Sequence, residues 1–434
     1  MTQALTRTLS LTQLIFYGVG TIVGAGIYTI IGSAAGIAGK ALWVSMLFAG
    51  AAAFLTALSY AELISMLPKA GAEYQFLKAA FPRFPLVAFL AGFLIALNAA
   101  ATSATVSLAF AGYLKVFVDV PAPLTALALL TVCTALNIAG MRQSTWVSIG
   151  LIVIEVGGLV LLVVLGLSKG DTGAAITLPD FGDSPGIFAA TALVFFVYIG
   201  FEDVANLSEE AKNPRIDVPR ALLWSVAITS VVYMLVVWAV FALMEPSQLA
   251  QSDSPLTTAG RAVAPWLGQT LAVTAMFATA STALISLVSI SRLLFGMARD
   301  GDMPRILAKT LTRRKTPWVA ALALYVFACA LLPLGQVRII ASISALGILV
   351  VFVGVHASVL VLRFKAPEQQ RSFRAPLAIG RLPLLPPLGI AISLALMTQF
   401  EPIVYAVTAA AVVFGIAVYW VTRGGSRHAP KSSL

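Results

Sequence analysis

The chain has 434 residues, of which 59% are hydrophobic and only 11% are charged. A soluble domain of this size does not need so much apolar surface, so the composition predicts a polytopic α-helical membrane protein. The net charge of +10 comes from basic residues scattered over short loops, which argues against nucleic-acid binding and is typical of membrane topology. Cys133 and Cys329 both lie inside apolar runs, which argues against a disulfide framework or a metal site.

Twelve apolar runs are separated by short polar loops, and we expect each run to form a transmembrane helix. The first six are 11–35, 41–67, 86–118, 124–138, 145–167 and 187–207. The second six are 221–243, 267–297, 318–334, 339–362, 384–400 and 403–421. An even number of crossings places both termini on one side of the membrane.

The distribution of basic residues predicts which side that is. If the N-terminus is cytoplasmic, almost all of the 28 Lys and Arg residues fall in cytoplasmic loops. The exceptions are Lys40, Lys115, Lys169, Arg261 and Arg338. The positive-inside rule therefore predicts a multi-pass protein of the plasma (inner) membrane with both termini in the cytoplasm.

The centre of the first run is a poor place to continue a helix. Gly18, Gly20, Gly24 and Gly26 fall within nine positions, and each interior glycine costs about 1 kcal/mol relative to alanine. A break here would leave free N–H groups at the start of the outer half-helix, and with the helix dipole these form a site for a carboxylate. The alternative is a glycine face that packs against a neighbouring helix.

The sixth run is interrupted in the corresponding place, because Gly200, Glu202 and Asp203 lie near its middle. Interruptions in corresponding helices of two five-helix halves are typical of transporters with inverted repeats and a midplane binding site. The sequence thus predicts one transmembrane domain: 11–167 as the first repeat, 187–362 as the second, 384–421 as helices eleven and twelve, and 422–434 as a cytoplasmic tail.

Four acids lie within apolar runs, where a carboxylate costs at least about 2.5–3.5 kcal/mol unless it faces a cavity or a partner. Glu62 lies near the cytoplasmic end of its run, and we expect it to pair with an Arg or Lys of a loop. Glu155 is a candidate proton carrier, with a structural hydrogen bond to broken backbone as the alternative. Glu202 is a candidate substrate partner, gate or proton site, and Asp203 is expected to brace the half-helix.

The eighth run carries several hydroxyl side chains, which commonly serve as packing residues in membrane helices. Ser281 and Thr282 could instead coordinate a cation beside the open backbone of the first run. His356 is the only intramembrane histidine, and a packing role is favoured over a proton relay.

Four motifs resemble the amino acid–polyamine–organocation transporters over nearly the whole chain. Gly24-Ala25-Gly26 resembles that superfamily's substrate-carboxylate motif. The other three are Ser59-Tyr60-Ala61-Glu62-Leu63 with Pro68, Ala70-Gly71 and Tyr74; 208–221, which begins Ser-Glu-Glu-Ala-Lys-Asn-Pro-Arg; and 297–304, which reads Met-Ala-Arg-Asp-Gly-Asp-Met-Pro. All four occur in order and on the expected helices.

The resemblance implies an all-α, leucine-transporter-like fold with broken helices one and six. It implies that amides of Ala25 and Gly26 hold the substrate carboxylate and that carbonyls of the sixth run receive the α-amino group. The predicted substrate site comprises Ile22, Gly24, Ala25, Gly26, Phe196, Tyr198, Ile199 and Glu202. Ser281 falls where sodium-coupled relatives of the fold bind a cation.

One position departs from the pattern. Proton-coupled and heteromeric members of the superfamily commonly carry a lysine in helix five, at the position that matches Glu155. A carboxylate cannot imitate that cation when ionised, although it can bind a cation or carry a proton. The coupling residues predicted here are Glu155, Ser281 and Thr282.

The sequence as a whole predicts a secondary amino acid transporter that works by alternating access and couples uptake to protons. The alternatives are a cationic amino acid or polyamine exchanger and a sodium-coupled symporter. No cofactor, metal or nucleic acid is expected, and the expected partners are the amino acid substrate, the coupling ion and the lipid bilayer. A membrane-embedded enzyme is disfavoured because His356 and His428 do not supply a catalytic cluster.

Overall fold

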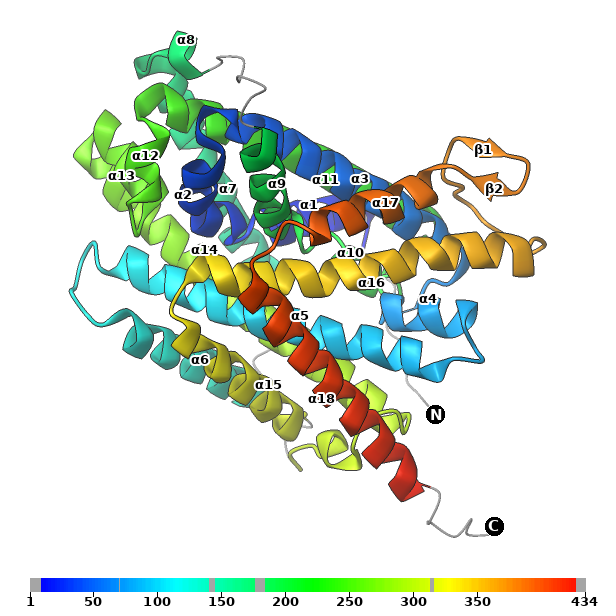
Figure 1. Cartoon of the computed structure of the whole chain (residues 1–434). Coiled ribbons are helices and arrows are strands. Elements are labelled where there is room, and N and C mark those ends of the chain that lie inside the picture. The colour runs from blue at the N-terminus through cyan, green and yellow to red at the C-terminus, as the bar shows by residue number, and fades with distance from the viewer. Residues whose placement is uncertain (1–8, 70, 140–144, 176–183, 313–315, 427–434) are drawn as a thin grey trace.

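The computed structural model describes residues 9–69, 71–139, 145–175, 184–312 and 316–426, and these ranges are mostly helical (Figure 1). Ala70 of the second motif and residues 427–434 of the predicted tail lie outside them. The helices of the first half are α1 (Leu11–Val23), α2 (Gly26–Ala38), η1 (Gly39–Ala41), α3 (Leu42–Met66), α4 (Ala72–Ala80), α5 (Pro85–Leu114), α6 (Ala122–Ala139), α7 (Thr145–Lys169) and α8 (Thr172–Ala175).

The second half begins with α9 (Ser184–Tyr198) and the short α10 (Asp203–Asn206). It continues with α11 (Pro214–Leu243), α12 (Pro246–Ala250), α13 (Pro255–Val263), α14 (Pro265–Arg299), η3 (Arg305–Ala308), α15 (Trp318–Leu331), η4 (Leu332–Leu334) and α16 (Val337–Lys365). An antiparallel hairpin, β1 (Ala378–Ile379) and β2 (Leu382–Pro383), pairs Ala378 with Pro383 and precedes α17 (Leu385–Met397) and α18 (Pro402–Ser426).

Within the described ranges, nine helical segments are long and apolar enough to cross a membrane. One of them joins α2, η1 and α3 into a stretch of 41 residues, and α1, α15 with η4, and α17 are shorter apolar helices. The chain is therefore a multi-pass α-helical membrane protein. Each of the twelve predicted runs contains helix, while the number of crossings and the inverted repeat stay predictions.

The two ends of the helical bundle differ. The short helices α8, α12 and α13 gather at one end, and α4 and the hairpin lie at the opposite end (Figure 1). The chain entering α1 also belongs to the end with α4, because Leu9 pairs with Ala211 in the segment after α10. We call this end the α4 face.

A buried ion cluster connects helices near the α4 face. Glu62 of α3 is 1% exposed and receives two hydrogen bonds from Arg363 of α16, at 2.8 and 2.6 Å. Its carboxylate also lies 3.5 Å from the Arg371 guanidinium and accepts the backbone N–H of Ala375 at 2.9 Å. Arg371 in turn donates to backbone carbonyls of Leu362 and Ala366 where α16 ends. The expected basic partner of Glu62 is therefore present, and the cluster joins α3, α16 and the segment before the hairpin.

His356 of α16 is completely buried. Its ring nitrogens lie 2.8 Å from the Ser59 hydroxyl and 3.3 Å from the Thr56 hydroxyl, so both nitrogens have partners on α3. A side chain added at Gly389 of α17 would overlap the imidazole, which shows how closely the helices meet there. These contacts support the packing role favoured for this histidine.

The ion cluster makes stability sensitive to Glu62. Glu62→Ala leaves two buried guanidinium groups without their carboxylate, and we expect the free energy of unfolding to fall by about 3–5 kcal/mol. The control is Lys40→Ala, which removes a surface pair with Glu245 whose side chains are 47% and 60% exposed. That variant should change stability by less than about 1 kcal/mol. Unfolding of the detergent-solubilised protein followed by tryptophan fluorescence measures both, and equal losses would contradict the assignment.

Candidate functional site between the broken helices

Two helices are interrupted in the interior of the bundle. Helix α1 ends at Val23 and α2 begins at Gly26, with Gly24 at φ 7° and ψ −138° between them. Helix α9 ends at Tyr198 and α10 begins at Asp203, with Gly200 at φ 122° between them. A φ of this size is readily adopted only by glycine, so Gly200 permits the second break. The sequence predicted both interruptions, and the structure confirms them.

The two breaks lie against each other. The Thr21 hydroxyl donates to the Gly200 carbonyl at 3.1 Å. A Cβ added to Gly200 would lie 2.8 Å from the Thr21 carbonyl oxygen, and one added to Gly26 would lie 3.0 Å from the Val197 Cα. Only residues without a side chain allow the two backbones to approach this closely.

The four glycines of the first run divide between the two interpretations considered for them. A Cβ at Gly18 would overlap Ser225 of α11, and one at Gly20 would overlap Ile152 of α7. These two glycines therefore permit helix packing. Gly24 and Gly26 instead lie at the break itself. The packing interpretation therefore applies to Gly18 and Gly20, and the break interpretation to Gly24 and Gly26.

One tyrosine joins both breaks. The Tyr233 hydroxyl of α11 lies 2.6 Å from the Ile22 carbonyl oxygen and 3.0 Å from the Val197 carbonyl oxygen. Tyr233 is completely buried and meets the Tyr198 ring edge-to-face at 5.3 Å between centroids. Carbonyls next to an interruption lose helical partners, and in a membrane interior a side chain has to replace them. Tyr233 supplies that replacement to both helices at once.

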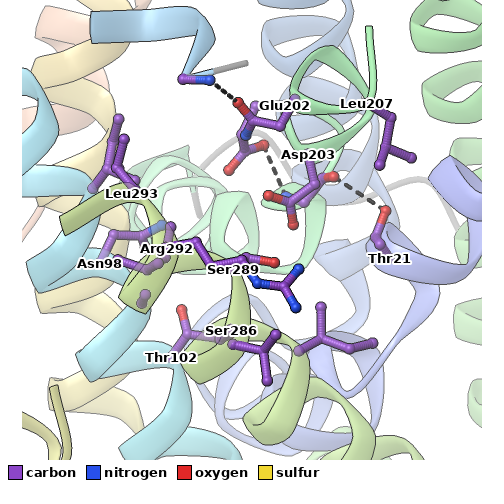
Figure 2. A pocket seen from close by; sticks show the side chains of 18 of the residues that line it. Thr21, Asn98, Thr102, Glu202, Asp203, Leu207, Ser286, Ser289, Arg292 and Leu293 are labelled. Atoms are coloured by element: carbon purple, nitrogen blue, oxygen red, sulfur yellow. Dashed lines mark hydrogen bonds between the residues drawn. The ribbon is translucent and has the colours of Figure 1, made fainter. Parts of the chain in front are cut away.

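A cavity of about 880 Å³ extends from the breaks to the α4 face. Its lining includes Thr21, Gly200 and Thr282 beside the breaks, residues of α4, and the exposed or partly exposed Glu209, Glu210, Arg299 and Asp300. Figure 2 shows Thr21, Glu202, Asp203 and Leu207 on one side and Asn98, Ser286, Ser289 and Arg292 on the other. In this conformation the breaks are thus reached from the α4 face.

The predicted site residues fall into two groups. Ile199, Glu202, Glu155, Ser281 and Thr282 line the cavity. The others predicted for the substrate site are Ile22, Gly24, Ala25, Gly26, Phe196 and Tyr198, and these lie behind that lining. The Ala25 amide donates to the Thr282 hydroxyl at 3.2 Å, so this hydroxyl stands between the amide and the cavity.

Glu155 of α7 lies where three helices meet. Its side chain is 3% exposed, and the Ser281 hydroxyl of α14 donates to Oε1 at 2.8 Å. The Tyr28 hydroxyl of α2 donates to the backbone carbonyl of Glu155 at 2.8 Å. No ion pair involves Glu155 in the part of the chain that the structure describes. For a buried carboxyl with one hydroxyl partner, the neutral form has the smaller desolvation cost.

Glu202 is 7% exposed and folds back on its own segment. Its Oε2 accepts the Gly200 backbone N–H at 2.9 Å, and so it satisfies one backbone group freed by the break. Asp203 begins α10 and lies beside it in the cavity (Figure 2). The carboxylate of Glu202 therefore has a structural partner in this conformation.

Part of the cavity lining was not predicted from the sequence. Arg292 was counted with the cytoplasmic loops, but it lies on α14 and its guanidinium points into the cavity (Figure 2). It follows Ser286 and Ser289 on one helical face, and this three-residue spacing was the available signal. Asn98 and Thr102 of α5 give no comparable pattern; both bond Ser344 of α16. Among the described residues, no group of three or more His, Cys, Asp or Glu side chains is placed to hold a metal ion.

A second cavity of about 510 Å³ lies toward the opposite end. Tyr28, Lys115, Asp253 and Arg338 are among its lining residues. Contacts hold its walls together: the Tyr113 hydroxyl donates to the Tyr28 carbonyl at 2.6 Å, and Lys115 pairs with Asp253 at 2.9 Å. Tyr28 lines this cavity and donates to the backbone carbonyl of Glu155, which lines the other, so one hydrogen bond links the linings of the two cavities.

These features together describe a membrane protein with broken helices at the end of a one-sided cavity. Residues 9–432 match the family model described as "Amino acid permease". The chain belongs to the amino acid permease family. This family lies within the amino acid–polyamine–organocation superfamily named by the sequence motifs, and its members are transporters rather than enzymes.

Relatives of this permease transport different compounds. It is 28% identical to a branched-chain amino acid permease of Bacillus subtilis, over 96% of this chain and 93% of the relative. It is 29% identical to a methylthioribose transporter of the same organism, over 96% of this chain and 94% of the relative. A vacuolar cationic amino acid transporter of Arabidopsis thaliana is 33% identical, over 84% of this chain and 64% of the relative.

A solved structure shares the fold of the permease. It is the crystal structure of a mutant of the manganese transporter of Eremococcus coleocola, with a TM-score of 0.60 and 14% sequence identity. The match covers 96% of this chain and 95% of that one. At this identity the likeness concerns the fold alone.

The tyrosine between the breaks gives a direct test of the site's geometry. Tyr233→Phe removes one hydroxyl and leaves two buried carbonyls without a partner, which should cost about 1–3 kcal/mol and reduce transport. Tyr198→Phe is the matched control, because its hydroxyl contacts the Met46 carbonyl of α3, at 3.2 Å, and Ser230 of α11, and bonds neither break. Thermal unfolding and uptake by reconstituted protein should both be affected more by Tyr233→Phe. The reverse order would show that Tyr233 does not support the breaks.

Proposed function

We propose that this permease is a secondary amino acid transporter of the plasma membrane that couples uptake to protons by alternating access. The observation that carries the proposal is the meeting of the two helix breaks at the end of a cavity open to one face. Broken backbone is tolerated at membrane depth where it lines a cavity or is buried in protein. Such breaks present unpaired amides and carbonyls, and these suit the two charged groups of an α-amino acid.

The N-terminus of α2 is proposed to hold the substrate carboxylate. Its N-cap residue is Ala25, whose own side chain cannot cap the helix, so the first amides keep their positive character. Thr282 already offers an oxygen to the Ala25 amide, at the place where a carboxylate oxygen would bind. We therefore expect the substrate to displace the Thr282 hydroxyl.

The α-amino group is proposed to lie at the C-terminus of α9. The last carbonyls of a helix carry negative character and have no helical donors. Ile199 and Gly200 follow this helix end and line the cavity. The ammonium would thus lie between carbonyls of the second break, and the carboxylate would face amides of the first.

The two cavities support alternating access. The larger one reaches the breaks from the α4 face, while contacts of Tyr28, Tyr113 and Lys115 close the other side. The positive-inside distribution predicts that the α4 face is cytoplasmic. On that orientation the structure represents an inward-open state.

Glu155 is proposed as the proton-carrying group. It is buried, lines the cavity and is hydrogen-bonded by Ser281, and its neutral form suits this surrounding. Exposure to water on either side would favour proton release, and coupling requires that proton affinity differ between the two states. The rival is a sodium ion bound by Glu155, Ser281 and Thr282, since the Glu155 carboxylate, the Ser281 hydroxyl that bonds it and the Thr282 hydroxyl are all oxygen ligands.

Glu155→Gln mimics the permanently protonated carrier. In proteoliposomes it should retain amino acid exchange but lose accumulation driven by an imposed pH gradient. Glu245→Gln, a change at a surface acid outside the cavity, is the control and should leave both activities intact. If the wild-type protein needs sodium at fixed pH and ignores the proton gradient, Glu155 is a sodium ligand and the proton assignment is wrong.

A cationic amino acid is the second candidate substrate. Glu202 and Asp203 line the cavity beside the breaks, and a relative of this chain is a cationic amino acid transporter. Uptake of labelled leucine and of labelled arginine is measured while a panel of unlabelled amino acids competes. This experiment separates a neutral from a cationic substrate. For a neutral substrate, Asp203→Asn should change affinity by less than about threefold, whereas for a cationic one it should weaken affinity by about tenfold or more.

A further inference from the structure

Glu73 is a buried acid that the proposed transport cycle does not use. It lies on the first turn of α4, outside the membrane-spanning helices, and is only 2% exposed. Even so, it lines the large cavity, and the Tyr60 hydroxyl of α3 donates to its Oε1 at 2.9 Å. It forms no ion pair with any residue in the described ranges.

Helix α4, which carries Glu73, is docked on α10, the short helix that follows the second break. The Asn206 side chain of α10 accepts the Gly71 backbone N–H at 2.9 Å and the Ala72 backbone N–H at 3.2 Å. It thereby caps the N-terminus of α4 from another helix. On the opposite flank, the Tyr74 hydroxyl donates to Asp302 after α14. Helix α4 therefore bridges two walls of the cavity mouth.

The charges that face Glu73 come from several elements. Glu202 and Asp203 lie on the α10 side, and both are acidic. Arg292 of α14 is basic and lines the same cavity. On α4 itself Lys78 is engaged with Asp302 at 3.7 Å.

The other elements packed on α4 bring few further ionisable groups. Helix α5 has no ionisable side chain except Tyr113 at its far end. On α16, His356 bonds to α3, Arg363 pairs with Glu62, and Lys365 reaches the Ala80 carbonyl. An ionised Glu73 is thus opposed chiefly by Asp203 of the helix on which α4 docks.

Burial and the negative charge of Asp203 raise the pKa of Glu73 to about 7, against the opposite effect of a backbone hydrogen bond and the Tyr60 hydroxyl. The neutral form therefore predominates below this value. Above this pH, the ionised Glu73 carboxylate faces Asp203 across the contact between Asn206 and the N-terminus of α4.

We propose that Glu73 binds a proton from the open cavity and that this proton holds α4 docked on α10, so that deprotonation releases the contact and favours closure of the mouth. The site is distinct from Glu155, and the inference does not depend on proton-driven uptake. It makes the open state sensitive to the pH of the α4 face.

The distance between α4 and the segment that follows α10 tests this directly. Spin labels at cysteines replacing Ala79 of α4 and Lys212 of that segment, with Cys133 and Cys329 changed to alanine, report the docking of α4 by double electron–electron resonance in nanodiscs without substrate. The docked population should fall as pH rises from about 6 to about 8 in the parent protein, a range that brackets the raised pKa of Glu73. In Glu73→Gln it should stay high throughout, and in the surface control Glu245→Gln it should fall as in the parent.

Two further variants keep the test decisive if Glu73→Gln folds poorly. Asp203→Asn removes the charge that raises the pKa of Glu73 and that opposes its ionised form, so the transition should move to lower pH and become smaller. Tyr60→Phe removes a donor that stabilises the ionised carboxylate, so it should move to higher pH. A pH profile that is identical in the parent, Glu73→Gln, Asp203→Asn and Tyr60→Phe would overturn the proposal, whether or not transport is proton-coupled.

Discussion

The structure depends on one constraint: backbone groups freed inside the membrane need partners. At each break the helical hydrogen bonds stop, and side chains of other residues bond the freed backbone groups. Tyr233 serves carbonyls of both breaks, Thr282 serves the Ala25 amide, and Glu202 serves the Gly200 amide. A buried backbone group without a partner costs about as much as a lost hydrogen bond, so these contacts are conditions for an interrupted helix rather than additions to it.

In the proposed transport cycle, the substrate would exchange for some of these side-chain contacts. A hydroxyl such as that of Thr282 binds an amide more weakly than a carboxylate does, since charge-assisted hydrogen bonds are the stronger ones. In the proposed cycle an arriving amino acid would therefore replace the Thr282 side chain without leaving the Ala25 amide unpaired. The tyrosine clamp at Tyr233 lies behind the cavity and would keep the two breaks together while the substrate changes.

Much of the architecture could be predicted from sequence because apolar length and glycine placement are local signals. The interruptions at Gly24–Gly26 and at Gly200 were predicted correctly for this reason. The sequence did not predict which glycines pack against other helices and which bound the break. Packing of Gly18 on Ser225 and of Gly20 on Ile152 depends on which helices become neighbours. The basic partner of Glu62 was expected, but its identity as Arg363 requires the fold, since the two residues are 301 positions apart.

The cavity lining was harder to predict than the breaks. Arg292 was counted with the loop charges although it lies within the predicted run 267–297, and on α14 it lines the cavity. Glu73 gave no comparable signal, since its burial depends on tertiary contacts of α4, among them those with Tyr60 of α3 and Asn206 of α10. Ionisable residues at the edges of apolar runs therefore need three-dimensional information before a role is given to them.

We propose above that the two breaks hold the two charged groups of an amino acid. An experimental structure of the protein with a transported amino acid bound tests this most directly. The carboxylate is expected at the N-terminus of α2, with the Thr282 hydroxyl displaced from the Ala25 amide, and the ammonium is expected at the end of α9 near Ile199. Substrate bound in the cavity without contact to either break, and with the Ala25–Thr282 hydrogen bond intact, would contradict it.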